Sequence, residues 1–171
     1  GSCHGRLFLF NQVDARKFQW QDRVVDRLPD FMMADPWVTR EFLVQDLMAH
    51  LEETTPIHDR LVTSHGDFHD RQVLSHHGEF VVLDLDEMCL APPAFDLATF
   101  GAHLVHGRPG DLERARRVLD ALVAGYGPRP PDLDWHLAVA LLARSPFPFR
   151  KDLDAEWPER IWQMVEDARS V

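Results

Sequence analysis

Residues 61–86 read LVTSHGDFHDRQVLSHHGEFVVLDLD, and this stretch decides the fold assignment. Two apolar runs, at 61–64 and 80–83, each lead into a carboxylate, Asp67 and Asp84, and between them lie a third short strand candidate at 72–74 and a turn at 76–79. Valine and leucine runs of this length, bounded by glycine and polar residues, are typical of buried strands. A carboxylate at the end of a buried strand is costly unless a cation offsets it. The pattern therefore predicts a hairpin that brings two carboxylates to a divalent cation or a reacting hydroxyl.

Helices are predicted on both sides of this stretch. Apolar periodicity and capping residues place them at 14–31, 35–53, 94–105, 111–125, 132–142 and 156–168, with a break at 145–148. The second is well bounded, because Asp35 suits the N-cap and Pro36 the first helical position. An isolated hairpin is marginal in water and needs packing partners. The expected fold is α+β, mostly α, as one domain over 1–171 with a small hairpin carrying the site.

Charge and composition narrow the range of partners. The chain of 171 residues has 28 acidic and 18 basic residues and a net charge of −10, which argues against a nucleic-acid surface. No apolar run approaches the roughly 18–20 residues of a membrane span, so no membrane partner is expected. With two cysteines, Cys3 and Cys89, a disulfide framework is not expected and the cytoplasm is the predicted compartment.

Several side chains of this centre suit phosphate or metal chemistry. Asp67 would accept a hydrogen bond from a substrate hydroxyl, although a turn-forming aspartate is the plain alternative. Asp86 lies two positions after Asp84, so on an extended chain both carboxylates point the same way. Carboxylates together with the amide oxygen of Gln72 would form an oxygen ligand set for Mg²⁺.

Histidines leave a second chemistry open. His65, His69 and Asp70 flank Asp67, and imidazoles with carboxylates suit Zn²⁺ or Fe²⁺, as in a metal-dependent hydrolase. The other helix and loop histidines look scattered and are interpreted as hydrogen-bonded or exposed: His50, His58, His103, His106 and His136. Neither a phosphate-cradling glycine loop nor a Gly-x-Ser-x-Gly nucleophile elbow is present.

Three motifs in order carry a family resemblance. Residues 65–74 read HGDFHDRQVL, residues 82–86 read VLDLD with Asp84 seventeen positions after Asp67, and residues 92–98 read PPAFDLA. Their types and spacing resemble the aminoglycoside phosphotransferase and choline kinase family. The match is close over 61–98, and it implies that the chain is the helical C-terminal lobe of a protein-kinase-like fold.

The resemblance implies a role for each matching residue. Asp67 would be the catalytic aspartate that orients or deprotonates the acceptor hydroxyl, and His65 would hold the catalytic loop in shape. Asp84 would bind the Mg²⁺ that bridges the ATP phosphates. Gln72 stands where the family has a second metal-binding asparagine, and Asp96 would brace the loop through hydrogen bonds. Gln72 is one methylene longer than asparagine, which puts the second metal site in question.

The implied function is ATP- and Mg²⁺-dependent phosphorylation of a hydroxyl on a small molecule such as an aminoglycoside, an amino alcohol or a sugar. The acceptor cleft would lie between the catalytic loop and residues 111–170, where four acidic residues would meet an amine: Asp132, Asp134, Asp152 and Asp154. The family's N-terminal ATP-binding lobe has no match here, and Gly1-Ser2 resembles a tag scar. The chain is therefore expected to be a fragment that is inactive alone. The alternatives are a non-catalytic pseudokinase-like lobe that binds a partner or ligand, and the metal-dependent hydrolase.

Overall fold

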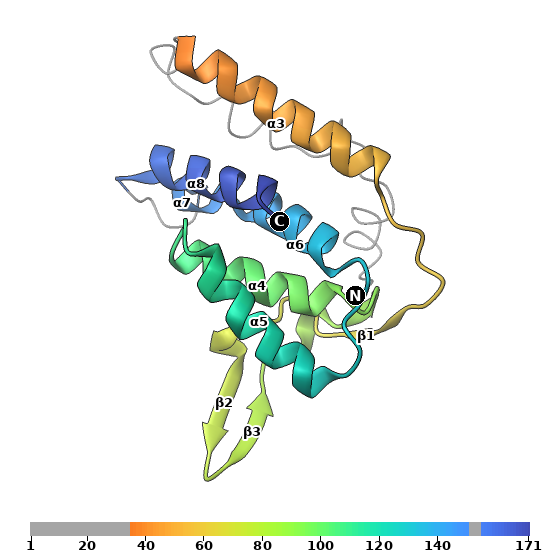
Figure 1. The fold of residues 1–171 in the computed structure, drawn as a ribbon. Helices are drawn as coiled ribbons and strands as arrows, with labels where there is room; N and C mark the ends of the chain where they lie inside the picture. The colour runs from red at the N-terminus through yellow and green to blue at the C-terminus, as the bar shows by residue number, and fades with distance from the viewer. Residues whose placement is uncertain (1–34, 151–154) are drawn as a thin grey trace.

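The computed structural model describes residues 35–150 and 155–171, and the side chains of 43–148 and 155–171 (Figure 1). The helix predicted at 14–31 lies outside the described residues. None of the described helices combines the length and the apolar character that crossing a membrane requires.

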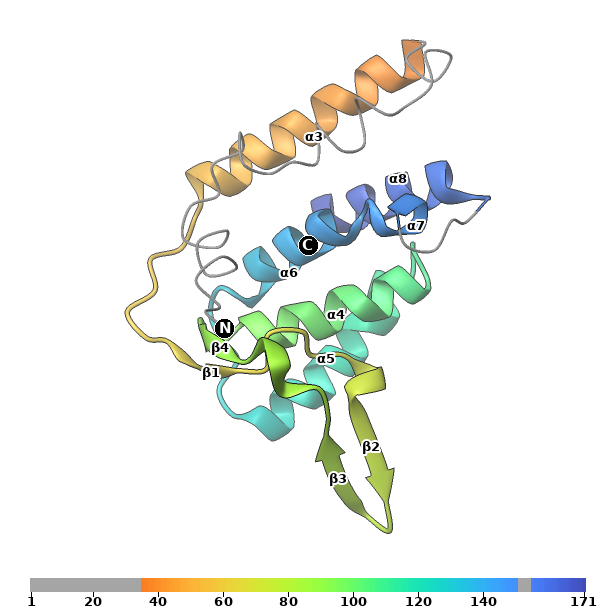
Figure 2. The same ribbon diagram turned by 180° about the vertical axis from the view of Figure 1, so that it is seen from behind.

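Four helices form the body of the protein: α4 (Phe95–Gly107), α5 (Leu112–Tyr126), α6 (Leu133–Arg144) and α8 (Trp157–Arg169). α4 packs against α5 and α6, and α6 packs against α8 (Figures 1 and 2). α6 buries seven of its 12 residues, as its almost wholly apolar sequence predicts. Asp111 caps α5 by accepting a hydrogen bond from the Arg114 amide at 3.3 Å. The predicted helices at 94–105, 111–125, 132–142 and 156–168 are thus confirmed to within two residues at each end.

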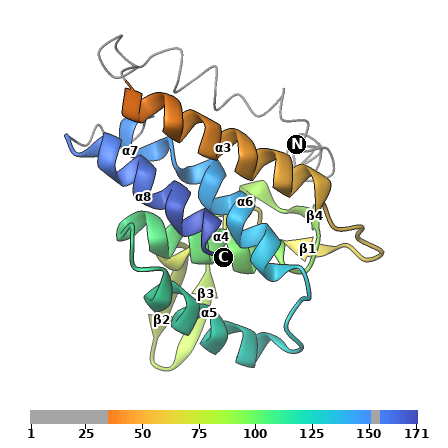
Figure 3. The same ribbon diagram turned by 45° about the horizontal axis from the view of Figure 1, so that its top comes forward.

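Two further helices flank this body. α3 (Asp35–Glu53) lies along one side of it, and Val44, Leu47, Met48 and Leu51 belong to the same buried cluster as the body helices (Figure 3). The indole Nε1 of Trp135 donates to the Leu51 carbonyl at 3.1 Å. The short helix α7 (Phe147–Arg150) occupies part of the predicted break at 145–148. The predicted break is confirmed at 145–146, where α6 has ended, but Pro148 lies inside α7 because proline is tolerated in the first turn of a helix.

The strands form two separate antiparallel pairs. β2 (Val73–His76) and β3 (Glu79–Val82) make the predicted hairpin, with His76 opposite Glu79. Its two turn residues, His77 and Gly78, both have positive φ, as a type I′ turn requires. The second pair joins β1 (Val62–Ser64) to β4 (Cys89–Ala91). β4 was not predicted, because three residues are too few to show an alternating pattern.

One expectation about the hairpin is wrong. β3 was predicted to be buried, but all four of its residues are exposed, with Phe80 at 72% and Val81 at 53%. The hairpin projects from the helical body (Figures 1 and 2), which agrees with the exposure of its strand residues. The structure is therefore mostly helical with small antiparallel sheets, as predicted, but the hairpin lies outside the core.

Candidate active site

The loop after β1 is fixed by a carboxylate from another element. Asp96, in the first turn of α4, accepts a hydrogen bond from the His65 amide at 2.7 Å and another from the Gly66 amide at 3.1 Å. Burial is the largest influence on Asp96 and raises the pKa of its carboxyl, while the two amides act in the opposite direction. One side chain thus holds two consecutive peptide groups of the HGD motif in place.

Gly66 allows a close approach between this loop and the segment after β3. It has φ +92°, a left-handed conformation that favours glycine. A Cβ built at this position would overlap the backbone carbonyl oxygen of Glu87. Glu87 ends the 3₁₀ turn η4 (Leu85–Glu87), which directly follows Asp84. The motif glycine is therefore required both by its own backbone angle and by the neighbouring chain.

His65 links the two carboxylate-bearing segments. Its ring Nδ1 accepts a hydrogen bond from the Asp67 amide at 3.3 Å, and its Nε2 lies 2.7 Å from the Leu83 carbonyl oxygen, to which it donates. A single imidazole thereby ties Asp67 to the residue that precedes Asp84. Because both ring nitrogens are already hydrogen-bonded, His65 is a poor metal ligand. The hydrolase hypothesis therefore loses one of its proposed ligands.

Gln72 and Asp84 are in direct contact. The Gln72 amide Nε2 donates to Asp84 Oδ2 at 2.9 Å, and the Gln72 backbone carbonyl accepts from the Leu83 amide at 2.8 Å. Asp84 has φ 58° and ψ 61°, a left-handed conformation that is uncommon for a residue with a side chain. Strained backbone of this kind is often found at functional sites. The exposed carboxylate and the amide together offer oxygen ligands of the type that Mg²⁺ prefers, so the donor set fits that ion.

The argument that supported Asp86 as a metal ligand does not hold in the structure. Residues 85–87 form a 3₁₀ turn, so the alternation of an extended chain does not relate Asp86 to Asp84. The assignment of Asp86 as a metal ligand stays a prediction without that support. The structure brings the segments that carry Asp67, Gln72 and Asp84 together through His65 and through backbone pairing.

A first histidine cluster follows the HGD loop: its members His69 and Asp70 were candidate metal ligands in the sequence, whereas His103 was missed. His103 Nδ1 on α4 lies 3.0 Å from Asp70 Oδ1, and the His69 and His103 rings stack at 4.3 Å between centroids. Burial, followed by the charge of Arg144, lowers the pKa of His103 to about 4, so the ring is neutral at pH 7. His103 was interpreted singly because only the tertiary fold brings α4 to the loop that carries His69 and Asp70.

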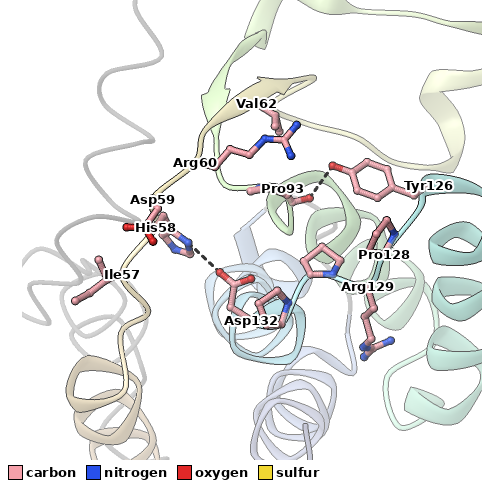
Figure 4. Close-up of a pocket in the computed structure, with 12 residues that line it drawn as sticks. Ile57, His58, Asp59, Arg60, Val62, Pro93, Tyr126, Pro128, Arg129 and Asp132 are labelled. Carbon is pink, nitrogen blue, oxygen red and sulfur yellow. Dashed lines mark hydrogen bonds and ion pairs between the residues drawn. The ribbon is translucent and has the colours of Figure 1, made fainter.

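A second histidine cluster lies at the start of α6. His58 Nδ1 and His136 Nε2 approach Asp132 Oδ2 at 2.9 and 3.4 Å, and the Nε2 atoms of the two histidines are 3.2 Å apart. This cluster adjoins a pocket of about 590 Å³ whose lining includes neither Asp67 nor Asp84 (Figure 4). The i, i+4 spacing of Asp132 and His136 was a usable signal in the sequence, but nothing local pointed to His58.

The comparison with known families agrees with these motifs. The chain matches the model of the Phosphotransferase enzyme family over residues 1–138. The chain belongs to this family. The predicted relationship to the aminoglycoside phosphotransferases is thereby confirmed, and membership indicates a phosphotransferase of the kinase type. A search of curated proteins found no match.

Proposed function

We propose that the intact protein transfers the terminal phosphoryl group of ATP to a hydroxyl group of a small molecule, with Mg²⁺ as the metal. The observation that carries the proposal is the bridge made by His65, which joins the Asp67 amide to the carbonyl that precedes Asp84. Phosphoryl transfer depends on positioning and on neutralising charge, so a rigid link between base and metal ligand is what it requires.

Asp67 is the proposed catalytic residue. It follows the two peptide groups held by Asp96, and its own amide is held by His65. Its carboxylate would accept the hydrogen bond of the acceptor hydroxyl and receive its proton as the bond to phosphorus forms. His65 and Asp96 are positioning residues in this scheme, because each acts through the backbone of the loop.

Asp84 would hold the metal, with Gln72 beside it. Mg²⁺ supplies neutralisation of the phosphate charge when it is bound. Gln72 donates its amide hydrogen to Asp84 Oδ2. We therefore propose that its main role is to orient that carboxylate, and that metal binding in place of the family's asparagine is secondary. Asp86 is a further candidate ligand.

The acceptor would be a small molecule with a free hydroxyl, but two of the four acidic residues proposed to meet its amine already have partners. Asp134 accepts from Arg129 at 2.7 Å, and Asp132 pairs with His58. Asp152 and Asp154 lie outside the described residues. His69 and Asp70, which follow the proposed base Asp67 in the sequence, are better candidates for contact with an acceptor.

The test replaces Asp67 by asparagine in the full-length protein and measures phosphoryl transfer from labelled ATP to a panel of aminoglycosides, amino alcohols and sugars. Loss of a positioned base is typically worth about 10²–10⁴ in rate. Asp46→Asn, which changes an exposed carboxylate of α3, is the matched control and should leave the rate unchanged. A rate for Asp67→Asn within tenfold of wild type would refute the assignment of the base.

A second candidate function is a non-catalytic lobe that binds a partner or ligand. It is favoured by Gln72, whose amide nitrogen rather than oxygen faces Asp84. Calorimetric titration of Mg·ATP into the full-length protein separates the two functions. Binding with turnover supports the kinase, whereas absence of binding supports the non-catalytic lobe.

A further inference from the structure

Three residues of metal-binding types converge away from the candidate active site. His58 comes from the segment between α3 and β1, and Asp132 is the N-cap of α6 (Figure 4). His136 lies one turn into that helix. One ligand atom from each lies within 4.8 Å of the others. The residues are thus drawn from two segments 74 positions apart in the chain, counted from His58 to Asp132.

The separations fit the coordination sphere of a small d-block cation. In a tetrahedral site with bonds of about 2.0–2.1 Å, ligand atoms lie about 3.4 Å from one another. Asp132 Oδ2 and His136 Nε2 are 3.4 Å apart, and the Nε2 atoms of His136 and His58 are 3.2 Å apart. Asp132 Oδ2 and His136 Nε2 thus already have the spacing of two ligands, while His58 presents its Nδ1 to Asp132 and its Nε2 to His136.

Burial and charge also favour a cation. The side chains of His58, Asp132 and His136 are 8%, 15% and 0% exposed. The ion pairs described for Asp132 are both with imidazoles. A carboxylate that is mostly buried is costly unless a cation offsets its charge, and a divalent ion beside Asp132 would do so.

We propose that His58, Asp132 and His136 bind a Zn²⁺ ion that fastens the segment between α3 and β1 to the N-terminus of α6. Two imidazoles and a carboxylate are a ligand set that Zn²⁺ accepts. His58 and Asp132 also line the pocket of about 590 Å³, so the fourth coordination position is open to a water molecule or another small donor.

The other histidine cluster, of similar composition, provides an internal contrast. His69 Nδ1 already accepts a hydrogen bond from the Arg71 amide at 3.2 Å. The charges of Arg144 and Arg71 both act to lower the pKa of His103, so cations lie close to that cluster. Positive neighbours disfavour a metal ion there. Arginines also line the pocket beside the proposed zinc site, but Arg129 is already paired with Asp120 and Asp134. The zinc proposal does not depend on the proposed phosphotransferase function.

The first experiment titrates the chelator-treated chain with Zn²⁺ in a calorimeter. One site with a Kd of about 1 μM or tighter is expected. His58→Gln and Asp132→Asn, which remove one ligand each with little change in size, should each weaken binding at least tenfold. His103→Gln, in the contrasting cluster, is the matched control and should keep wild-type affinity. Circular dichroism verifies that each variant is folded. If His58→Gln does not fold, Asp132→Asn, which keeps the size of the side chain, provides the test.

The second experiment replaces Zn²⁺ by Co²⁺, whose visible spectrum reports the ligands. A tetrahedral spectrum without a thiolate charge-transfer band supports the proposal. A thiolate band would assign the ion to a cysteine, and loss of binding only in His103→Gln would assign it to the other cluster; each result would overturn the proposal. Failure of the wild-type chain to bind Zn²⁺ would overturn it as well, leaving His58, Asp132 and His136 as a hydrogen-bonded triad.

Discussion

The HGD loop and the β2–β3 hairpin are adjacent in the sequence but are held by opposite kinds of interaction. The loop around Gly66 is buried, and its amides are bonded to the distant Asp96 and to His65 within the loop itself. The hairpin is bonded mainly within itself, through strand pairing and a two-residue turn. In Figure 2 it stands clear of the helical body.

This difference shows that an apolar sequence and a buried position are separate properties. The hairpin has the more apolar sequence, yet Phe80 is 72% exposed. The HGD loop is more polar, yet Gly66 and His65 are buried because their amides bond to Asp96 of α4 and the His65 ring bonds to the Asp67 amide and the Leu83 carbonyl. The candidate catalytic residues belong to the region where long-range polar contacts fix the backbone, and substitutions there should have the larger effects.

The largest expected effect comes from Gly66→Ala. A methyl group there would overlap the Glu87 carbonyl, and alanine at φ +92° is strained as well. We expect at least about 2 kcal/mol loss in the free energy of unfolding, measured with urea, together with loss of phosphoryl transfer.

Gly78→Ala is the matched control in the hairpin. Gly78 has φ +82°, but nothing lies within 4 Å of a Cβ built there. Only the backbone strain is left, about 1 kcal/mol, and activity should be retained. Equal losses for the two variants would mean that the overlap with Glu87 has no role and that the loop is no more constrained than the hairpin.

The sequence predicted those features whose signals are local. Helix periodicity and capping aspartates placed α4, α5, α6 and α8, and the motif spacing led to the family. The hairpin was predicted from the strand candidates at 72–74 and 80–83, separated by the turn His76-His77-Gly78-Glu79. Its burial could not be predicted, because a strand pattern does not reveal which other elements will cover it.

Long-range contacts explain what was missed in the site. The bridge by His65 requires the Leu83 carbonyl, 18 positions away, to lie beside its Nε2. The contact of His58 with His136 joins residues 78 positions apart. The argument for Asp86 failed for a local reason, since the left-handed Asp84 starts a 3₁₀ turn where an extended chain was assumed. Only the family resemblance singled out Asp96, because an aspartate in a first helical turn is common on any surface.

A smaller effect is expected for Asp96→Asn. An asparagine oxygen can accept from one of the two amides, so the other loses its acceptor, at a cost of about 1–3 kcal/mol. Phosphoryl transfer should fall as well, because the loop that carries Asp67 is less well held. The measurement is urea unfolding of wild type and variant at several pH values.

The pH dependence of this variant follows from the direction of the pKa shift. The pKa of Asp96 is raised in the folded protein, so folding favours its protonated form. The stabilisation is therefore fully present below the unfolded pKa of about 3.9 and is lost as pH rises through the folded pKa. The advantage of wild type over Asp96→Asn should grow as pH falls from 7 toward 4. An advantage that shrinks over this range would contradict the assigned shift.

The smallest expected effect is that of Phe80→Ser in the hairpin. Since most of this ring is already in water, truncating it should change the free energy of unfolding by no more than about 0.5 kcal/mol. Leu137→Ala in α6, where the side chain is 1% exposed, gives the contrast and should cost about 2–5 kcal/mol. A loss above about 1 kcal/mol for Phe80→Ser would show that the ring is covered in solution. The hairpin would then be part of a packed surface, and its difference from the catalytic loop would be one of chemistry rather than of burial.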